Sequence, residues 1–245
     1  MKVLLRFVIL AVGLLAFVPS ALAGDELTKI DEALNRWKTL DYRMEVVTSK
    51  PDKEKSVLDL RMRMRVHDDY NQQLVEIDKP ADMKGTKVLV KSPTKMYIYL
   101  PAFGKVRRIA SHVTEQGFLG TALSQKDLTI TRYSDKYDFT VVSDSADTVV
   151  LRLTAKTDDA PYPKIEMEVE KKRWLPIKLR YYGDEDKHLK TEERKDYKCK
   201  EKHCTPSTMV ITDHTSNTTS TLSTKKFEVN PELADELFSK RYLMN

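Results

Sequence analysis

The chain has 245 residues, of which 40% are hydrophobic and 32% are charged, and its 42 Lys and Arg nearly balance its 37 Asp and Glu. With a mean hydropathy of −0.50, this composition excludes a polytopic membrane protein, and a charge this close to balance does not favour nucleic acid as a partner. The chain has only 7 glycines and no GxGxxG, GxxxxGKS/T or GxSxG motif, so nucleotide-dependent enzymes and α/β-hydrolases are not expected.

The first 23 residues have the three parts of a secretory signal peptide. Lys2 and Arg6 precede an apolar, uncharged run from residue 7 to residue 18, and Ala21-Leu22-Ala23 has the small-x-small pattern of a cleavage site. The alternative is an uncleaved membrane anchor, but the apolar run is short for a membrane span. We therefore predict an exported protein with a signal peptide at residues 1–23 and a single domain at residues 24–245.

After this leader, one helix and then a long series of strands are predicted. Leu27, Ile30, Leu34 and Trp37 fall on one stripe of a helix over residues 25–40. The apolar period then changes to two, which indicates about a dozen short strands at hairpin spacing. The predicted strands are 42–47, 58–66, 73–77, 87–91, 95–100, 105–109, 139–142, 148–154, 164–170, 175–182, 191–197, 208–213 and 219–222.

Two further helices are predicted in the second half of the chain. Ser124, followed three residues later by Asp127, predicts a short helix where the alternation fades. Asn230 and Pro231 predict a final helix that ends at Arg241. Because no linker or repeat divides the chain, we predict a mainly β (α+β) fold, a strongly curved antiparallel sheet that forms an incomplete β-barrel. Its concave side must be filled by helices, by its own side chains or by a ligand.

The strand at residues 58–66 shows the alternation most clearly. Its apolar face carries Leu58, Leu60, Met62, Met64 and Val66. Its other face carries Arg61, Arg63 and Arg65. We expect the first face to be buried and the arginine face to be exposed to solvent. Methionines on such apolar faces either line a surface that adapts to flexible ligands or fill an irregular core, and the residues alone leave both open.

The cysteines and histidines predict a disulfide and no catalytic or metal site. Cys199 and Cys204 are the only two cysteines, and four intervening residues suit a turn between two strands. His203 raises the alternative of a metal site, but a structural zinc needs four ligands and no second cysteine pair is available. No histidine stands in an HExxH pattern and no acid–base set converges, so we predict no enzyme, no metal and no cofactor.

The stretch from residue 85 to residue 128 resembles the outer membrane lipoprotein-sorting protein family, the periplasmic carriers of the LolA/LolB-like superfamily. That family's larger branch shows a G-T-x-x-L strand, an aromatic strand ending in L-P, a K-x-R-R-I strand and a Phe–Gly turn leading to D-L. The matching residues are Gly85, Thr86, Leu89, Tyr97, Tyr99, Leu100, Pro101, Lys105, Arg107, Arg108, Ile109, Phe118, Gly120, Asp127 and Leu128. These motifs cover about a fifth of the chain, and the leader, helix and strands agree with the family's whole length.

The resemblance implies an incomplete β-barrel of about eleven strands, capped by helices, with an apolar cavity for acyl chains. The residues assigned to this lipid-binding cavity are Leu58, Leu60, Met62, Met64, Val66, Leu89, Met96, Ile98, Leu100 and Met167. The residues assigned to a lid or partner contact are Lys105, Arg107, Arg108, Phe118, Leu119 and Leu123. The N-terminal helix is expected to act as a second lid.

The function implied by the resemblance is that of a periplasmic carrier or chaperone. It would shield acyl chains of lipids or lipoproteins between membranes, with an inner-membrane lipid exporter and an outer-membrane acceptor as partners. The alternative is a non-catalytic envelope interaction protein whose barrel is filled and whose exposed strands bind another protein.

Overall fold

The computed structural model describes residues 24–67, 70–92, 94–109, 117–124 and 126–244. The predicted signal peptide lies outside the described residues. In the described part, a short helix, α1 (Glu26–Leu34), precedes a series of thirteen strands. These are β1 (Thr39–Ser49), β2 (Ser56–His67), β3 (Tyr70–Lys79), β4 (Lys87–Ser92), β5 (Lys95–Leu100), β6 (Lys105–Ile109), β7 (Tyr137–Asp144), β8 (Thr148–Ala155), β9 (Lys164–Glu170), β10 (Leu175–Tyr182), β11 (His188–Lys200), β12 (His203–Asp213) and β13 (Thr218–Val229).

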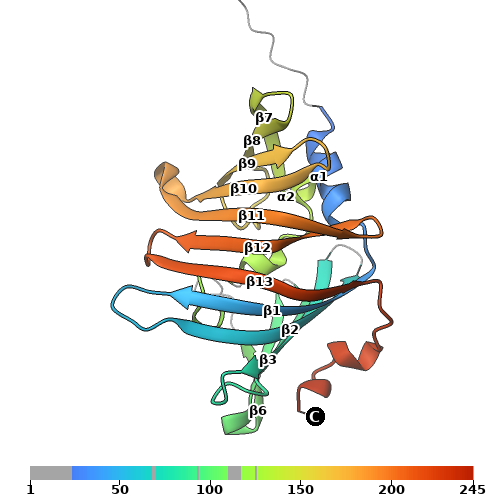
Figure 1. The fold of residues 1–245 in the computed structure, drawn as a ribbon, viewed down its shortest axis with the longest axis vertical. Coiled ribbons are helices and arrows are strands. Elements are labelled where there is room, and N and C mark those ends of the chain that lie inside the picture. Colours follow the sequence, from blue (N-terminus) through green and yellow to red (C-terminus); the bar gives the residue numbers. More distant parts are fainter. Residues whose placement is uncertain (1–23, 68–69, 93, 110–116, 125, 245) are drawn as a thin grey trace, which may run out of the picture.

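All thirteen strands form one antiparallel sheet in the order β6-β5-β4-β3-β2-β1-β13-β12-β11-β10-β9-β8-β7. The pairing of β1 with β13 joins the first and last strands of the chain, and β6 and β7 are the two edges. Figure 1 shows the strands stacked along the long axis in one curved layer. The predicted curved, incomplete barrel is confirmed, and each strand predicted from alternation lies within an observed one.

The helices are shorter than predicted. α1 ends at Leu34, because the chain turns there and enters β1 at Thr39; the Trp37 indole donates to the Leu34 carbonyl oxygen at 2.9 Å. The segment after Ser124 forms a 3-10 turn, η4 (Lys126–Thr129), rather than an α-helix. A second short helix, α2 (Tyr133–Lys136), follows it and was not predicted.

The final helix predicted up to Arg241 is wrong. The described chain forms two 3-10 turns there, η6 (Asp235–Phe238) and η7 (Tyr242–Met244). Asn230, with a positive φ of 54°, uses its side chain to accept the Lys38 backbone N–H at 2.7 Å instead of capping a helix. Docking against the sheet therefore decides the conformation of residues 231–244, which we call the C-terminal segment.

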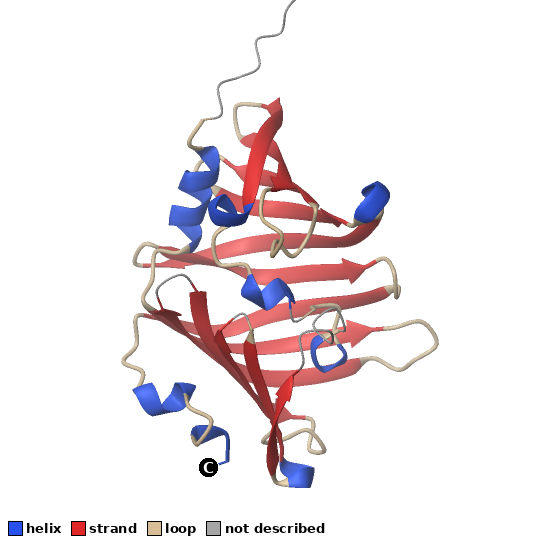
Figure 2. Ribbon diagram, turned by 180° about the vertical axis from the view of Figure 1, so that it is seen from behind, coloured by secondary structure: helices blue, strands red, loops and turns tan. Residues whose placement is uncertain are grey.

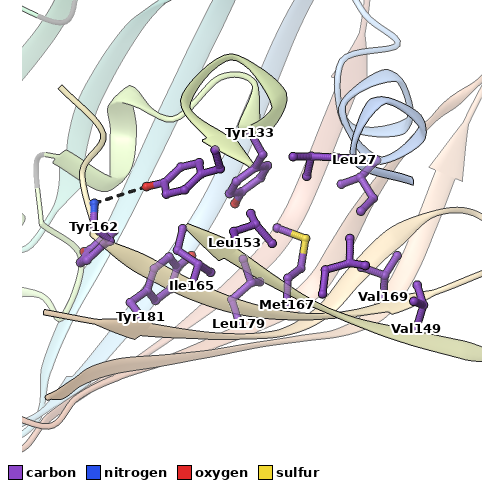
Figure 3. Packing of buried hydrophobic residues seen from close by; sticks show 13 residues of the cluster. Leu27, Tyr133, Val149, Leu153, Tyr162, Ile165, Met167, Val169, Leu179 and Tyr181 are labelled. Carbon is purple, nitrogen blue, oxygen red and sulfur yellow. Dashed lines mark hydrogen bonds between the residues drawn. The ribbon is translucent and has the colours of Figure 1, made fainter. Parts of the chain in front are cut away.

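One face of the sheet carries α1, α2 and the turns between β6 and β7, as Figure 2 shows. At the β7–β10 end this concave face is packed solid, and we call this end the closed half. Its buried residues are Leu27, Ile30, Tyr133, Tyr137, Val149, Leu151, Leu153, Tyr162, Ile165, Met167, Val169, Leu179 and Tyr181. Figure 3 shows α1 and Tyr133 lying over the strand side chains, so helices fill this end.

α1 is fixed to α2 by one buried carboxylate. Asp31, 1% exposed, accepts the backbone N–H groups of Tyr133 at 2.7 Å and of Ser134 at 2.8 Å, which are the free donors at the start of α2. Burial raises the pKa of Asp31 although these hydrogen bonds oppose the shift. α1 is therefore a fixed part of the closed half.

The opposite, convex face is not fully exposed, which corrects the expectation for the arginines of β2. The C-terminal segment places Phe238 and Leu243 on an apolar cluster formed with Leu74, Leu89 and Tyr97. Beside it, Arg63 is 6% exposed and forms an ion pair with Glu76, and Arg65 lies 4.6 Å from the Phe238 ring centroid. Alternation assigned these residues to the correct face, but the segment that covers them is about 170 positions away in the sequence.

Candidate ligand-binding cavity

The other half of the concave face is not filled by helices. Its cluster joins strands β1 to β4, β12 and β13 to residues 117–124, which we call the lid segment. A partly open space of about 110 Å³ remains between them, which we call the inner cavity. It is lined by Met44, Val46, Leu58, Leu60, Met62, Val75, Phe118, Leu119, Thr121, Leu123, Met209 and Leu222. Nearly all of these side chains are apolar, so the inner cavity suits a hydrocarbon chain.

A larger space of about 270 Å³, the outer cavity, adjoins the inner one. Four residues line both spaces: Met44, Met62, Met209 and Leu222. The outer cavity adds polar groups to its apolar wall. They come from Asn35, Asn71, Thr131, Arg194, His203, Thr205 and Thr224. The two cavities together provide an apolar interior and a more polar outer end.

Methionines make the shared wall of the two cavities. Met44, Met62 and Met209 line both, and Met64 lines the outer one. All four are half-buried although the surrounding residues Val46, Leu58 and Leu222 are buried. Each of these side chains therefore packs against the apolar clusters on one side and borders a cavity on the other. Because methionine is unbranched and flexible, this wall can adapt to chains of different shape.

The lid segment is closed on itself by a bridge between its two ends and is attached to the sheet through Ala122. Gly117 and Ser124 form an isolated bridge, and the Ala122 backbone N–H donates to the Ser220 hydroxyl oxygen of β13 at 2.9 Å. Gly120 has a φ of 79°, a conformation that favours glycine and lets the segment turn sharply. Phe118 and Ala122 consequently point into the apolar cluster.

A buried ion pair follows the lid segment. Asp127 accepts from the Lys190 ammonium of β11, from the Tyr162 hydroxyl at 2.5 Å and from the Ser124 backbone N–H at 2.7 Å. The Lys190 and Asp127 side chains are only 6% and 11% exposed. Burial and the neighbouring Asp127 carboxylate raise the pKa of Tyr162, which therefore stays a hydrogen-bond donor. This Lys190–Asp127 pair ties the lid segment to the sheet.

Arg194 is the one charged side chain among the residues that line the inner and outer cavities. Its Nε donates to Glu192 at 2.6 Å, and Glu192 also accepts from the Tyr181 hydroxyl at 2.8 Å. Burial opposes the charge on Arg194, but the Glu192 carboxylate and the neighbouring tyrosines Tyr197, Tyr133 and Tyr181 together outweigh it, and the pKa of Arg194 is raised. A charged guanidinium, partly neutralised, therefore stands at the polar end of the outer cavity.

His203 is a second polar group at this end. It is 5% exposed, its Nε2 lies 3.0 Å from the Tyr42 hydroxyl, and its Nδ1 has no hydrogen-bond partner among the described residues. Desolvation lowers the pKa of His203 from 6.5 to about 4. The imidazole is therefore neutral at neutral pH, and it provides hydrogen bonding without charge.

We expect His203 to make the fold less stable in acid. Between pH 6.5 and about 4 the unfolded chain protonates this residue and the folded chain does not, so stability falls as the pH falls through this window. The loss amounts to about 3 kcal/mol at the low end. Urea unfolding at a series of pH values checks it, with His203→Gln as the comparison. A variant whose stability follows the same pH curve as the unmodified protein contradicts the assignment.

The structure brings together some of the residues assigned from the sequence. Leu58, Leu60 and Met62 line the inner cavity with Phe118, Leu119 and Leu123, and Met64 lines the outer cavity. Val66 lines a separate pocket of about 140 Å³, which shares Asn35, Trp37, Asn71 and Thr131 with the outer cavity, and it is 40% exposed. Three assigned residues lie on the concave side of β5 but do not line the two cavities formed by the described residues. They are Met96, Ile98 and Leu100.

Two assigned residues lie elsewhere, and this corrects the prediction. Leu89 is 0% exposed on the convex face, because Val88 and Val90 of the same strand take the concave one. Met167 is 0% exposed in the closed half, where α1 and α2 fill the space above it. The basic residues Lys105, Arg107 and Arg108 lie on the edge strand β6 and away from both cavity linings.

Several lining residues were not assigned from the sequence. Met44 and Leu222 lie in strands that were predicted, and the two-residue alternation of those strands places both side chains on the concave face. These two lining residues could therefore have been assigned from the sequence. Met209, Tyr42 and Trp37 line the outer cavity because β12, β1 and the α1–β1 turn come together there, where Tyr42 and Trp37 both contact His203 of β12. The predicted disulfide between Cys199 and Cys204 is present, and it closes the β11–β12 turn next to His203.

Neither a metal site nor a membrane-spanning helix is found in the described part of the chain. No group of three or more His, Cys, Asp and Glu there has the placement to hold a metal ion. The helices that the structure describes are too short or too polar to cross a bilayer.

Comparisons with known proteins agree with this fold. No curated protein sequence matches the chain. A structure described as an outer membrane lipoprotein-sorting protein domain from Vibrio parahaemolyticus superposes with a TM-score of 0.81 at 24% identity, over 90% of this chain and 97% of the other. A DUF1329 family protein from Desulfovibrio piger gives 0.81 at 21% identity, over 89% and 96%.

A LolA superfamily protein from Nitrosomonas europaea gives a TM-score of 0.72 at 20% identity, over 90% of this chain and 98% of that one. A family model described as an uncharacterized protein matches residues 69–245, well over half of the chain. The chain therefore belongs to this uncharacterized protein family and has the LolA-like fold of the lipoprotein-sorting structures.

Proposed function

We propose that this protein is a periplasmic carrier that binds acyl chains of lipids or lipoproteins and moves them between membranes. It makes and breaks no covalent bond. The observation that carries the proposal is the pair of adjoining cavities, an apolar inner one and an outer one with polar groups at its end. The likeness in fold to lipoprotein-sorting structures supports the same reading.

The driving force is the transfer of hydrocarbon out of water. Each buried methylene contributes about 0.8 kcal/mol, so about eight methylenes give roughly 6 kcal/mol before the cost of ordering the chain. The flexible wall of Met44, Met62 and Met209 allows the cavity to accept chains without a fixed shape. Release then requires an acceptor with a competing apolar site, or a wider cavity.

The lid segment is the element that we expect to move. Phe118 and Leu119 occupy the apolar cluster in this structure, so a longer chain needs their displacement. The segment is attached through Ser220 and through the Lys190–Asp127 pair, which are contacts that reform after opening. The closed half provides the rigid frame against which this movement takes place.

The compartment and partners belong to the same proposal. The signal-peptide pattern of residues 1–23 and the disulfide of Cys199 with Cys204 both support an oxidising compartment outside the cytoplasm. An inner-membrane lipid exporter as donor and an outer-membrane acceptor are the partners that a carrier of this kind requires.

A titration with a fluorescent long-chain fatty acid tests the proposal. We expect saturable binding with one site per chain, competed by phospholipid, and a negative heat-capacity change that marks burial of apolar surface. Absence of saturable binding, with the protein folded and free of bound lipid, rejects the carrier function and favours the interaction protein with a filled barrel.

A further inference from the structure

The sheet edge formed by β4, β5 and β6 has an unusual charge. From Met83 to Ile109 the sequence contains no Asp or Glu and seven basic residues. These are Lys84, Lys87, Lys91, Lys95, Lys105, Arg107 and Arg108. The rest of the chain has 42 − 7 = 35 basic residues against all 37 acidic ones. The positive charge of this nearly balanced protein is therefore concentrated at one end of its sheet.

The turn between β5 and β6 places an aromatic ring within this charge. Phe103, in the 3-10 turn η1 (Pro101–Phe103), is 59% exposed, the highest value among the large apolar side chains of the described residues. The Arg107 guanidinium lies 5.3 Å from its ring centroid, and Lys105 and Arg107 are both exposed. An exposed ring costs free energy in water, which a partner surface would recover.

The neighbouring turn adds to the same tip. Gly85, in the turn between β3 and β4, lies close to the β5–β6 turn: a Cβ atom at Gly85 would be 3.3 Å from the Pro101 side chain. Lys84, the residue before it, is exposed. Figure 1 shows the β6 end of the sheet at one extreme of the long axis, so nothing in the described fold stands beyond it. We call Lys84, Phe103, Lys105 and Arg107 the hairpin tip.

We propose that the hairpin tip docks this protein on an anionic phospholipid surface. Phe103 would enter the interfacial region of the bilayer, and the three basic residues would contact phosphate groups while their aliphatic stems remain among the lipids. An acidic protein surface would match the charge but would not require a single protruding ring. The inner cavity's cluster includes Ile98 and Ile109 of β5 and β6, so docking here brings the cavity half to the membrane.

Vesicle co-sedimentation tests the proposal with the chain that begins at Gly24. We expect partitioning onto phosphatidylglycerol-containing vesicles, weak binding to pure phosphatidylcholine, and loss at high salt. The double variant Lys105→Glu/Arg107→Glu should lower partitioning about 100-fold or more, and Phe103→Ser about tenfold. The matched controls are Lys225→Glu/Lys226→Glu, with the same charge change on exposed β13 residues, and Val142→Ser on the opposite edge strand.

Three results overturn the proposal. One is equal loss in the control and hairpin variants, a second is equal binding to neutral and anionic vesicles, and a third is no binding to either. Capture of an acidic protein with no vesicle binding assigns the surface to a protein partner instead. The test is independent of the carrier function, because fatty-acid binding by the hairpin variants is expected to stay unchanged.

Discussion

Met62→Glu is expected to abolish fatty-acid binding while the protein still folds. The Met62 side chain lines both cavities and is half-buried, so a carboxylate there lies beside a space that water can enter when no ligand is present. An acyl chain cannot solvate that charge. We expect affinity for a fluorescent fatty acid to fall by at least 100-fold, with about 1–3 kcal/mol lost in the free energy of unfolding.

The matched control is Val57→Glu on the same strand. Val57 is 44% exposed and lies on the opposite face from Leu58, so the same new charge stays in water. Its affinity and stability should remain close to those of the unmodified protein. Arg63 is not a suitable control, because it is buried and paired with Glu76. A folded Met62→Glu protein that binds fatty acid normally removes this residue from the site.

The second large effect concerns the buried pair beneath the lid segment. Lys190→Met leaves the Asp127 carboxylate without its cation at a site where both side chains are almost fully buried. Removing one partner of a buried pair typically costs about 3–5 kcal/mol, because the remaining charge is uncompensated. We expect a loss of this size in urea unfolding. A loss below about 1 kcal/mol would show that the pair is solvated.

The double variant Lys190→Met/Asp127→Asn separates charge from packing. Asn keeps one of the two carboxylate oxygens, which can accept the Ser124 backbone N–H, while its amide nitrogen can donate to the Tyr162 hydroxyl oxygen. No uncompensated charge remains. Most of the stability should therefore return. Because the tie between the lid segment and β11 is weakened, dissociation of bound fatty acid should become faster. Stability that stays as low as in the single variant contradicts the role of charge.

The strands were predictable from sequence because a half-buried strand repeats every two residues. Whether a given part of the concave face is a packed core or a cavity was not predictable from the sequence. Met62 and Met167 have the same alternating environment in the sequence, yet one lines a cavity and the other is sealed under α1 and α2. The difference depends on Asp31, which joins the two helices across about a hundred residues. No local pattern contains that information.

The predictions for Leu89 and for the C-terminal segment were wrong for related reasons. β4 is apolar on both faces, as Val88, Leu89 and Val90 show, so alternation alone cannot say which residue faces the concave side. Cross-strand register decides it, with Leu89 opposite Leu74. Phe238 and Leu243 have spacing that suits a helix, but they dock on the convex face as 3-10 turns. Tertiary contacts outweigh helix propensity there.

Native mass spectrometry of gently purified protein shows whether the two cavities hold an acyl chain. We expect the unmodified chain to carry additional mass that dissociates as an acyl lipid, and Met62→Glu, purified in parallel, to carry none. Extraction of the bound lipid into organic solvent, followed by mass spectrometry, should identify its chain length and head group. An unmodified protein that is free of lipid, and remains free after incubation with phospholipid vesicles and fatty acid, would contradict the carrier function.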